Sequence, residues 1–163
     1  MRIYIAGPLF SQGELEFNLI VNEHLKNLGF ETFLPQKDGH KLADLISNDE
    51  KSSAIKMIFY RDIEEIKKCD ILLFIMDGRV PDEGACFELG VAYSLNKYCL
   101  GLKTDPRFLM DNIDNPLILG ALEGKIAKSI FDLDIFLQSF KEEYFKKFGE
   151  KSEDIKRTAE ISQ

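Results

Sequence analysis

The feature that most constrains the fold of this chain is an apolar run, Ile71–Met76, near the middle of the sequence. The run contains no polar side chain, which is the pattern of a strand buried on both faces of a sheet. A turn-rich loop at residues 77–84 follows, and then Ala85–Asn96, where apolar residues recur at helical spacing. These three segments predict one strand–loop–helix unit of a parallel α/β sheet that is covered by helices.

The loop after this strand carries a cluster of acidic side chains. Asp77, Asp82 and Glu83 lie in or beside the loop, and Glu88 follows one turn into the helix among uncharged neighbours. Ligands of open α/β sheets bind beyond the carboxyl ends of the strands, so clustered acids at this place favour a functional site. A small residue such as Gly84 would let a ligand approach closely. The alternative is structural: Glu88 is a solvated helix residue and Asp82 is a helix cap.

The rest of the chain predicts alternating strands and helices. Strands are expected at residues 2–6, Phe30–Leu34, Tyr98–Leu102 and Ile126–Ile130, and helices at Glu14–Leu28, Ser53–Lys68, Leu117–Leu122 and Phe131–Phe148. Three helices carry apolar stripes that we expect to be buried: Phe17, Ile20, Val21, Leu25 and Leu28; Ile55, Ile58, Phe59, Ile63 and Ile66; and Leu133, Phe136, Leu137, Phe140, Tyr144 and Phe145. The irregular stretch 36–53 is a candidate lid or substrate loop.

These elements predict a doubly wound, three-layer α/β fold of the flavodoxin-like or Rossmann-like kind. Its five parallel strands are expected in the order 2-1-3-4-5, with a ligand crevice between strands 1 and 3. The length of 163 residues suits one domain, which we expect to occupy residues 1–148, followed by a frayed polar tail at 149–163.

Composition and charge exclude several classes of partner. The net charge of −7, with no basic cluster, argues against binding to a nucleic-acid polymer. No apolar run is long enough to cross a bilayer, so no membrane partner is expected. The cysteines, Cys69, Cys86 and Cys99, are odd in number and form no CxxC pair. Together with a first strand that begins directly after the N-terminus, they predict a cytoplasmic protein with reduced thiols.

The loop after the first strand is a poor phosphate site. Between Gly7 and Gly13 it has no Lys or Arg, and it lacks the glycine patterns of phosphate-binding loops. It also lacks the acidic pair that response regulators carry at this position. His24 and His40 form no metal-like cluster with other ligands, so no metal site is expected.

Four segments together resemble the nucleoside 2-deoxyribosyltransferase family over about residues 2–140. They are Tyr4–Pro8 (YIAGP), Pro35–Gly39 (PQKDG), Asp62 ahead of Cys69-Asp70, and Pro81–Ala92 (PDEGACFELGVA). The chain is also similar to a sister group that hydrolyses the N-glycosidic bond of nucleoside 5′-monophosphates. The shared motifs do not separate the two groups.

The resemblance implies a double displacement at the sugar. Glu88 would attack C1′ of a 2′-deoxyribonucleoside, the base would leave, and a second base would attack the deoxyribosyl ester on Glu88. Asp62 and Asp82 would contact the base and exchange its proton. Tyr4 would hold and orient Glu88. No cofactor is implied.

The resemblance also implies a substrate site and an assembly. The implied substrate-binding residues are Tyr4, Gly7, Pro8, Gln36, Asp38, Asp77, Gly84 and Asn115. Asn115 is the nearest candidate for an Asn that a neighbouring subunit places against the sugar 5′-hydroxyl. The implied partners are a nucleoside and a free nucleobase, and the implied assembly is a homo-oligomer, a dimer or larger, with a site shared between subunits.

Three activities remain open at this point: transfer of deoxyribose, hydrolysis of a nucleotide, and nucleotide sensing without catalysis. The complete set of Asp62, Asp82 and Glu88 argues against sensing. Arg107 would favour the nucleotide hydrolase if it approached a phosphate. The first loop, with no basic residue, argues against that hydrolase.

Overall fold

Five parallel strands form one sheet in this computed structural model, which describes residues 1–39, 51–108 and 113–160. The sheet order is β2-β1-β3-β4-β5, and every neighbouring pair is parallel. This confirms the predicted fold class and strand order. The strands are β1 (Arg2–Ala6), β2 (Glu31–Phe33), β3 (Ile71–Ile75), β4 (Tyr98–Leu102) and β5 (Ile126–Ala127).

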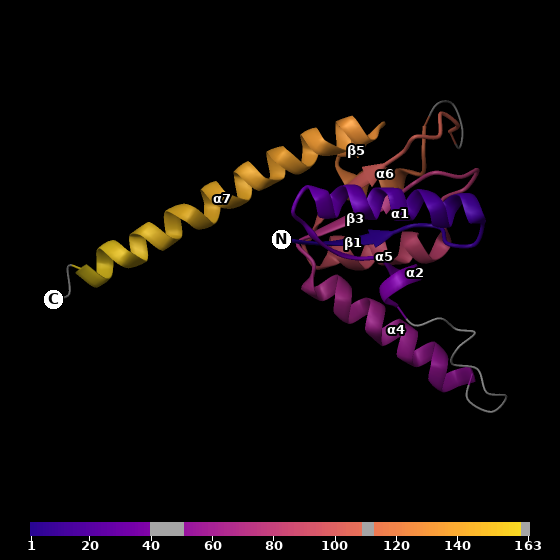
Figure 1. The fold of residues 1–163 in the computed structure, drawn as a ribbon, viewed down its shortest axis with the longest axis horizontal. Coiled ribbons are helices and arrows are strands. Elements are labelled where there is room, and N and C mark those ends of the chain that lie inside the picture. Colours follow the sequence, from indigo (N-terminus) through magenta and orange to yellow (C-terminus); the bar gives the residue numbers. More distant parts are fainter. Residues whose placement is uncertain (40–50, 109–112, 161–163) are drawn as a thin grey trace.

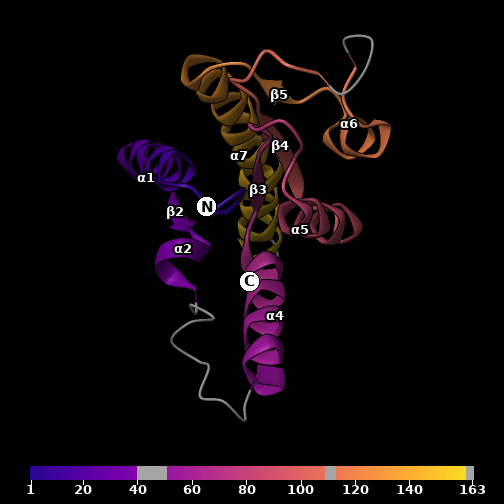
Figure 2. The same ribbon diagram turned by 90° about the vertical axis from the view of Figure 1, so that its right-hand side faces the viewer.

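Helices cover both faces of the sheet (Figure 1). They are α1 (Gln12–Asn27), α2 (Pro35–Asp38), α4 (Lys51–Lys68), α5 (Glu83–Ser94), α6 (Pro116–Leu122) and α7 (Ile130–Glu160). Figure 2 shows α1 and α5 on opposite sides of the strands. One core joins the sheet to α1 and α7, and the other joins it to α4, α5 and α6. The molecule therefore has the expected three layers.

The two cores follow from the alternation of side chains along the strands. Ile3 and Ile5 of β1 lie in the core under α1 and α7, whereas Tyr4 and Ala6 lie in the core under α4, α5 and α6. All residues of β3 are buried, which explains why its sequence is entirely apolar. Tyr4 therefore faces the same side of the sheet as α5.

Helix α1 begins earlier than the sequence predicted. Ser11 caps it by accepting the Glu14 N–H, and the Glu14 carboxylate accepts the Ser11 N–H in return. This capping box places the first turn at Gln12 rather than at Glu14.

The connection after β2 and the end of the sheet also differ from the predictions. The supposedly irregular segment contains the short helix α2, and α4 already begins at Lys51. Residues 40–50 of the predicted lid lie outside the described residues. Strand β5 ends at Ala127 rather than at Ile130, because Ser129 accepts the Asp132 N–H at the start of α7.

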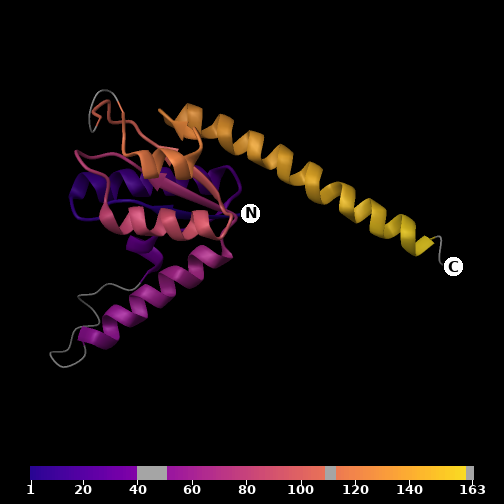
Figure 3. The same ribbon diagram turned by 180° about the vertical axis from the view of Figure 1, so that it is seen from behind.

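Parts of the predicted buried stripes are exposed. Ile20, Ile55, Phe59 and Phe145 are all largely exposed. On α1, the buried face instead includes two asparagines, Asn18 and Asn22. Figures 1 and 3 show that the far ends of α4 and α7 point away from the sheet.

Helix α7 is longer than predicted. It was expected to end at Phe148, but it continues to Glu160. The added segment is rich in Glu and Lys, which favour helix, and the single Gly149 weakens a helix by only about 1 kcal/mol. In the described ranges, no helix combines the length and apolar composition needed to cross a membrane.

Candidate active site

A cavity of ≈ 770 Å³ opens at the carboxyl ends of β1 and β3, where a doubly wound sheet is expected to bind its ligand. Three predicted catalytic carboxylates line it: Asp62 from α4, Asp82 at the start of α5, and Glu88 within α5. The structure therefore brings together acids that are far apart in the sequence. Other lining residues are Gly7, Leu9, Phe10, Leu15, Leu19, Pro35, Gln36, Gly39, Ile58, Gly84 and Ala85.

Glu88 is held by the buried tyrosine of β1. The Tyr4 hydroxyl donates a hydrogen bond of 2.6 Å to Glu88 Oε1. The Tyr4 ring stacks on Phe33, with 5.3 Å between the ring centroids. The carboxylate is thus positioned by a residue that is itself fixed in the core.

The surroundings of Glu88 disfavour its charged form. The pKa of Glu88 is raised to about 8, mainly by burial, with a contribution from the nearby Asp62 and Asp82 charges, and the Tyr4 hydrogen bond opposes these effects. Burial also raises the pKa of Asp62 to about 6, against the lowering effect of Arg61. The pKa of Tyr4 lies well above its ordinary value because of burial and the Glu88 charge. Near neutral pH this cluster therefore retains a proton in the free protein.

Asp82 has a structural role as well as a place in the cavity. Its side chain caps α5 by accepting the Ala85 N–H at 2.8 Å. The alternative interpretation of Asp82 from the sequence, as a helix cap, is therefore correct for this contact. The cap also fixes the carboxylate at the cavity wall, so the two roles are compatible.

The predicted Gly7 and Gln36 also line the cavity. A Cβ atom added at Gly7 would lie 2.9 Å from Cβ of Ile75, so the turn after β1 requires glycine at this point. Gln36 donates from Nε2 to the Leu15 carbonyl at 2.9 Å, which links α2 to α1.

Asn18 is a residue that the sequence interpretation missed. It is buried on α1 and donates from Nδ2 to the Pro8 carbonyl at 2.8 Å and to Gln36 Oε1 at 2.9 Å. Asn18 therefore joins the first loop to α2 at the cavity. Its position three residues before the buried Val21, on the face of α1 that also buries Asn22 and Leu25, was a usable signal.

Two predicted substrate residues do not line this cavity and support the backbone instead. Pro8 contributes its carbonyl to Asn18. Asp38 accepts the Leu34 N–H at 2.9 Å, and its carbonyl accepts a hydrogen bond of 2.7 Å from Arg61. Both residues thus stabilise the loops that frame the cavity.

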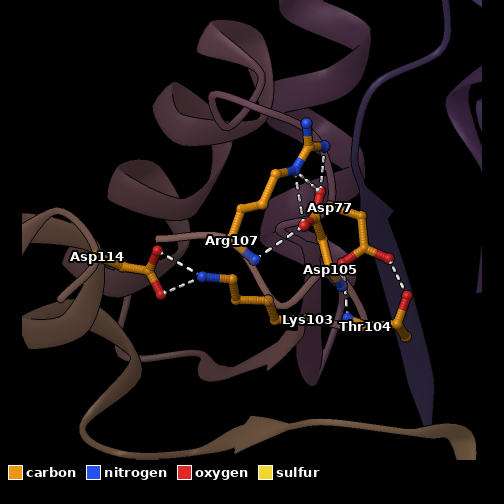
Figure 4. A network of polar contacts seen from close by, with 6 residues as sticks. All are labelled: Asp77, Lys103, Thr104, Asp105, Arg107 and Asp114. Carbon is orange, nitrogen blue, oxygen red and sulfur yellow. Dashed lines mark hydrogen bonds and ion pairs between the residues drawn. The ribbon is translucent and has the colours of Figure 1, made fainter. Parts of the chain in front are cut away.

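Two further predicted substrate residues lie elsewhere in one copy of the chain. Asn115 caps α6 and lines a separate cavity of ≈ 550 Å³ between α5 and α6. Asp77 accepts hydrogen bonds from Thr104 and Asp105 on the loop after β4 (Figure 4). Neither side chain lines the cavity that holds Glu88.

The walls of the cavity are more apolar than the sequence suggested. Leu9, Phe10 and Leu15 supply part of one wall, and a smaller cavity of ≈ 340 Å³ between α4 and α5 adjoins the other. The smaller cavity shares Asp62 and Glu88 with the large one and is otherwise lined mainly by Ile and Phe side chains. The carboxylates therefore lie between two cavities.

Two cations near this edge of the sheet, Lys103 and Arg107, are already paired. Lys103 is buried and contacts both carboxylate oxygens of Asp114, at 2.6 and 2.7 Å. Arg107 pairs with Asp105, as Figure 4 shows. Among the described residues that line the large cavity, none is Lys or Arg. Within the same described ranges, no group of three His, Cys, Asp or Glu side chains is arranged to hold a metal ion.

Comparisons with solved structures find the same fold in several proteins. A conserved protein from Enterococcus faecalis V583 is 27% identical, with a TM-score of 0.67 over 82% of this chain and 94% of that chain. A 2-deoxyribosyltransferase from Bacillus psychrosaccharolyticus is 25% identical, with a TM-score of 0.64 over 75% and 82%. A CMP N-glycosidase from Clostridium botulinum shares the fold at 19% identity, with a TM-score of 0.50 over 86% and 99%.

One of two sequence comparisons agrees with the structural ones. A search of curated protein sequences gives no match. The family model described as nucleoside 2-deoxyribosyltransferase matches residues 3–149, which is most of the chain and includes every residue of the Glu88 cavity. The chain therefore belongs to the nucleoside 2-deoxyribosyltransferase family.

Proposed function

We propose that this protein transfers 2-deoxyribose between nucleobases, with Glu88 as the nucleophile. The observation that carries the proposal is the hydrogen bond from buried Tyr4 to the half-buried Glu88, which shares one cavity with Asp62 and Asp82. The cavity volume of ≈ 770 Å³ lies in the range of about 300–1,000 Å³ typical of small-molecule sites.

The first step forms a bond between a Glu88 oxygen and C1′ while the bond from C1′ to the base nitrogen breaks. The departing base takes a proton, and Asp62 is assigned as its donor because it shares the cavity with Glu88 and burial raises its pKa. In the reactive form the proton lies on Asp62, and Glu88 attacks as the anion. Asp82 has one oxygen engaged in the α5 cap and is assigned a positioning contact to the base. In the second step another base attacks C1′, releases Glu88 and returns a proton, so the anomeric configuration is retained.

Transfer to a base requires that water be kept away from the deoxyribosyl ester on Glu88. In one copy of the chain, an exposed apolar surface leads to this site. Ile55, Phe59 and Phe87, which we call the α4–α5 surface, are 59%, 46% and 54% exposed. The rings of Phe59 and Phe87 lie 6.0 Å apart between centroids, and these residues line the smaller cavity that reaches Asp62 and Glu88. We propose that a second copy of the chain covers this surface.

Light scattering at micromolar concentration is expected to give a mass of at least twice the 18.7 kDa of one chain. Phe59→Glu should shift the protein towards the monomer, because it places a charge in the apolar contact. The matched control is Phe131→Glu on α7, since Phe131 is also exposed but lies outside the α4–α5 surface. A wild-type monomer would contradict the proposed assembly.

Free nucleosides are expected to react better than their 5′-monophosphates. The described lining of the cavity offers three carboxylates and no basic side chain, so a phosphate dianion meets repulsion without a charged donor. A difference of roughly 1.4 kcal/mol gives tenfold in kcat/KM, and we expect deoxyadenosine to exceed dAMP by at least about this factor. Added salt should narrow the difference. A preference for dAMP that disappears in Arg107→Ala would instead support nucleotide hydrolysis.

The direct test of the proposed function is a base-exchange assay. The protein is incubated with deoxyinosine, with and without free adenine, and separately with dGMP. Formation of deoxyadenosine only when adenine is present supports transfer. Release of base from dGMP, with no exchange of deoxyinosine, would replace transfer by nucleotide hydrolysis.

A further inference from the structure

The Asp77 carboxylate joins the loop before α5 to the loop after β4 (Figure 4). The Asp77 carboxylate accepts the backbone N–H of Thr104 at 2.6 Å and that of Asp105 at 2.9 Å, and it also accepts the Thr104 hydroxyl. The backbone N–H of Gly78 in turn lies near the Asp105 carboxylate and helps to lower the pKa of that group. We call this set of contacts the Asp77 brace.

The backbone geometry explains why these two loops lie close enough to form the Asp77 brace. Strands β3 and β4 are paired up to Ile75 and Leu102, so the two loops leave the sheet at the same level. Gly78 has a φ of +124°, a conformation that favours glycine. Arg107 holds the Asp105 carboxylate through its side chain and its backbone N–H. Arg107 therefore fixes the position of the Asp105 carboxylate.

The brace and the α5 cap together define the path of the loop that carries Asp82. The Asp77 brace fixes the beginning of the loop at residues 77–78, and the Asp82 cap fixes its end on Ala85. Arg79 and Val80 between these points are exposed and are not buried in the core. The position of Asp82, and of the first turn of α5, then depends on the brace.

We propose that Asp77 and Thr104 are positioning residues for deoxyribosyl transfer, which act through the loop at residues 77–82 on Asp82 and Glu88 and make no contact with substrate. This inference rests on the proposed function. It replaces the interpretation of Asp77 as a substrate-binding residue, because all its contacts described above go to the chain itself. It also explains why an acidic side chain follows β3 at a place outside the large cavity.

Asp77→Asn is the first test. Asparagine keeps one oxygen for the Thr104 and Asp105 N–H groups, which both donate to Oδ1, but it removes the charge that strengthens these hydrogen bonds. It also replaces the second oxygen, which accepts the Thr104 hydroxyl, by a donor. We expect kcat to fall by at least about tenfold while KM for the deoxynucleoside stays within about threefold, because small displacements of reacting groups lower kcat. Thr104→Val, which lacks the hydroxyl, should act in the same direction, and Thr104→Ser should retain the wild-type kcat.

Asp70→Asn is the matched control. Asp70 lies just before β3, at the opposite end of the strand, where its carboxylate accepts the Arg2 N–H at 2.8 Å. It therefore also joins neighbouring segments through a backbone N–H, but away from the Glu88 cavity. We expect Asp70→Asn to lower Tm without changing kcat or KM.

Hydrogen exchange supplies a measurement that does not depend on activity. Amides at residues 78–88 should exchange faster in Asp77→Asn than in wild type or in Asp70→Asn. An equal loss of Tm in both variants, with kcat and exchange unchanged, would make Asp77 purely structural and overturn the proposal. A raised KM with unchanged kcat and exchange would also overturn it, in favour of a substrate contact. If the wild type transfers no deoxyribose, the proposed function fails, and the hydrogen-exchange rates alone test the effect of the Asp77 brace on the loop. Unchanged hydrogen-exchange rates in Asp77→Asn would then overturn the proposal.

Discussion

Replacement of Glu88 by alanine or glutamine is expected to reduce base exchange to below about a hundredth of the wild-type rate, because loss of a covalent nucleophile typically costs far more than this. Glutamine is the sharper variant. Its Oε1 atom can still accept the Tyr4 hydrogen bond, which measures 2.6 Å in the wild type. The geometry is then preserved while the nucleophilic carboxylate is removed. The measurement is the rate of deoxyadenosine formation from deoxyinosine and adenine.

Thermal stability provides the control that the Glu88 variants fold. The pKa of Glu88 rises from its ordinary 4.5 to about 8 in the folded chain, so the folded state binds this proton more tightly than the unfolded state does. The corresponding stabilisation is present below about pH 4.5 and is lost as the pH rises towards 8. Glutamine does not titrate, so Glu88→Gln does not lose this stabilisation as the pH rises. The Tm of Glu88→Gln at pH 8 is therefore expected to equal or exceed that of the wild type.

A trapped intermediate gives the positive form of the same test. A slow 2′-fluoro nucleoside should leave a sugar adduct on Glu88 that mass spectrometry of the wild type detects and that Glu88→Gln lacks. Retention of more than about a hundredth of the wild-type rate in Glu88→Gln would mean that another group is the nucleophile.

The fold was predictable because its strongest signal is local. Ile71–Ile75 is apolar at every position, which a doubly buried parallel strand requires. The short helical connections then limit the strand order to few choices, and the order 2-1-3-4-5 is confirmed. The predictions that were wrong concern the ends of helices and strands and the exposed faces of the helices. Ile55 and Phe59 have the spacing of a buried stripe, but spacing does not reveal whether a neighbour covers that stripe.

The assignment of site residues came mainly from the family resemblance. It paired Tyr4 with Glu88, and the alternation of Tyr4 with Ile3 and Ile5 along β1 explains why Tyr4 faces the layer that contains α5. The resemblance also assigned Asp77, which follows β3, to the substrate. Its partners come from the loop after β4, and pairing between two loops leaves no periodic pattern in the sequence. The sequence analysis missed Asn18 for a similar reason, because its partners, Pro8 and Gln36, lie in other segments of the chain.

Tyr4→Phe is expected to move the pH dependence of the reaction upward. The Tyr4 hydrogen bond lowers the pKa of Glu88, whereas burial and the charges of Asp62 and Asp82 raise it to about 8. Phenylalanine keeps the ring that stacks on Phe33 but removes the donor. A hydrogen bond to a charged group contributes about 1.5–3 kcal/mol, which corresponds to roughly one to two pKa units. The pKa of Glu88 should therefore rise further in the variant.

The ionised nucleophile becomes scarcer at neutral pH as a result. We expect kcat/KM of Tyr4→Phe at pH 7 to fall by about 10- to 100-fold, which is the fraction of ionised Glu88 lost over one to two pKa units. The rise of kcat/KM with pH should move to higher pH by the same amount, so the deficit narrows in alkaline buffer. Tyr98→Phe at the start of β4 is the control, because Tyr98 contacts Phe140 and lies outside the Glu88 cavity. A deficit in Tyr4→Phe that is equal at every pH would show that Tyr4 orients Glu88 without tuning its charge.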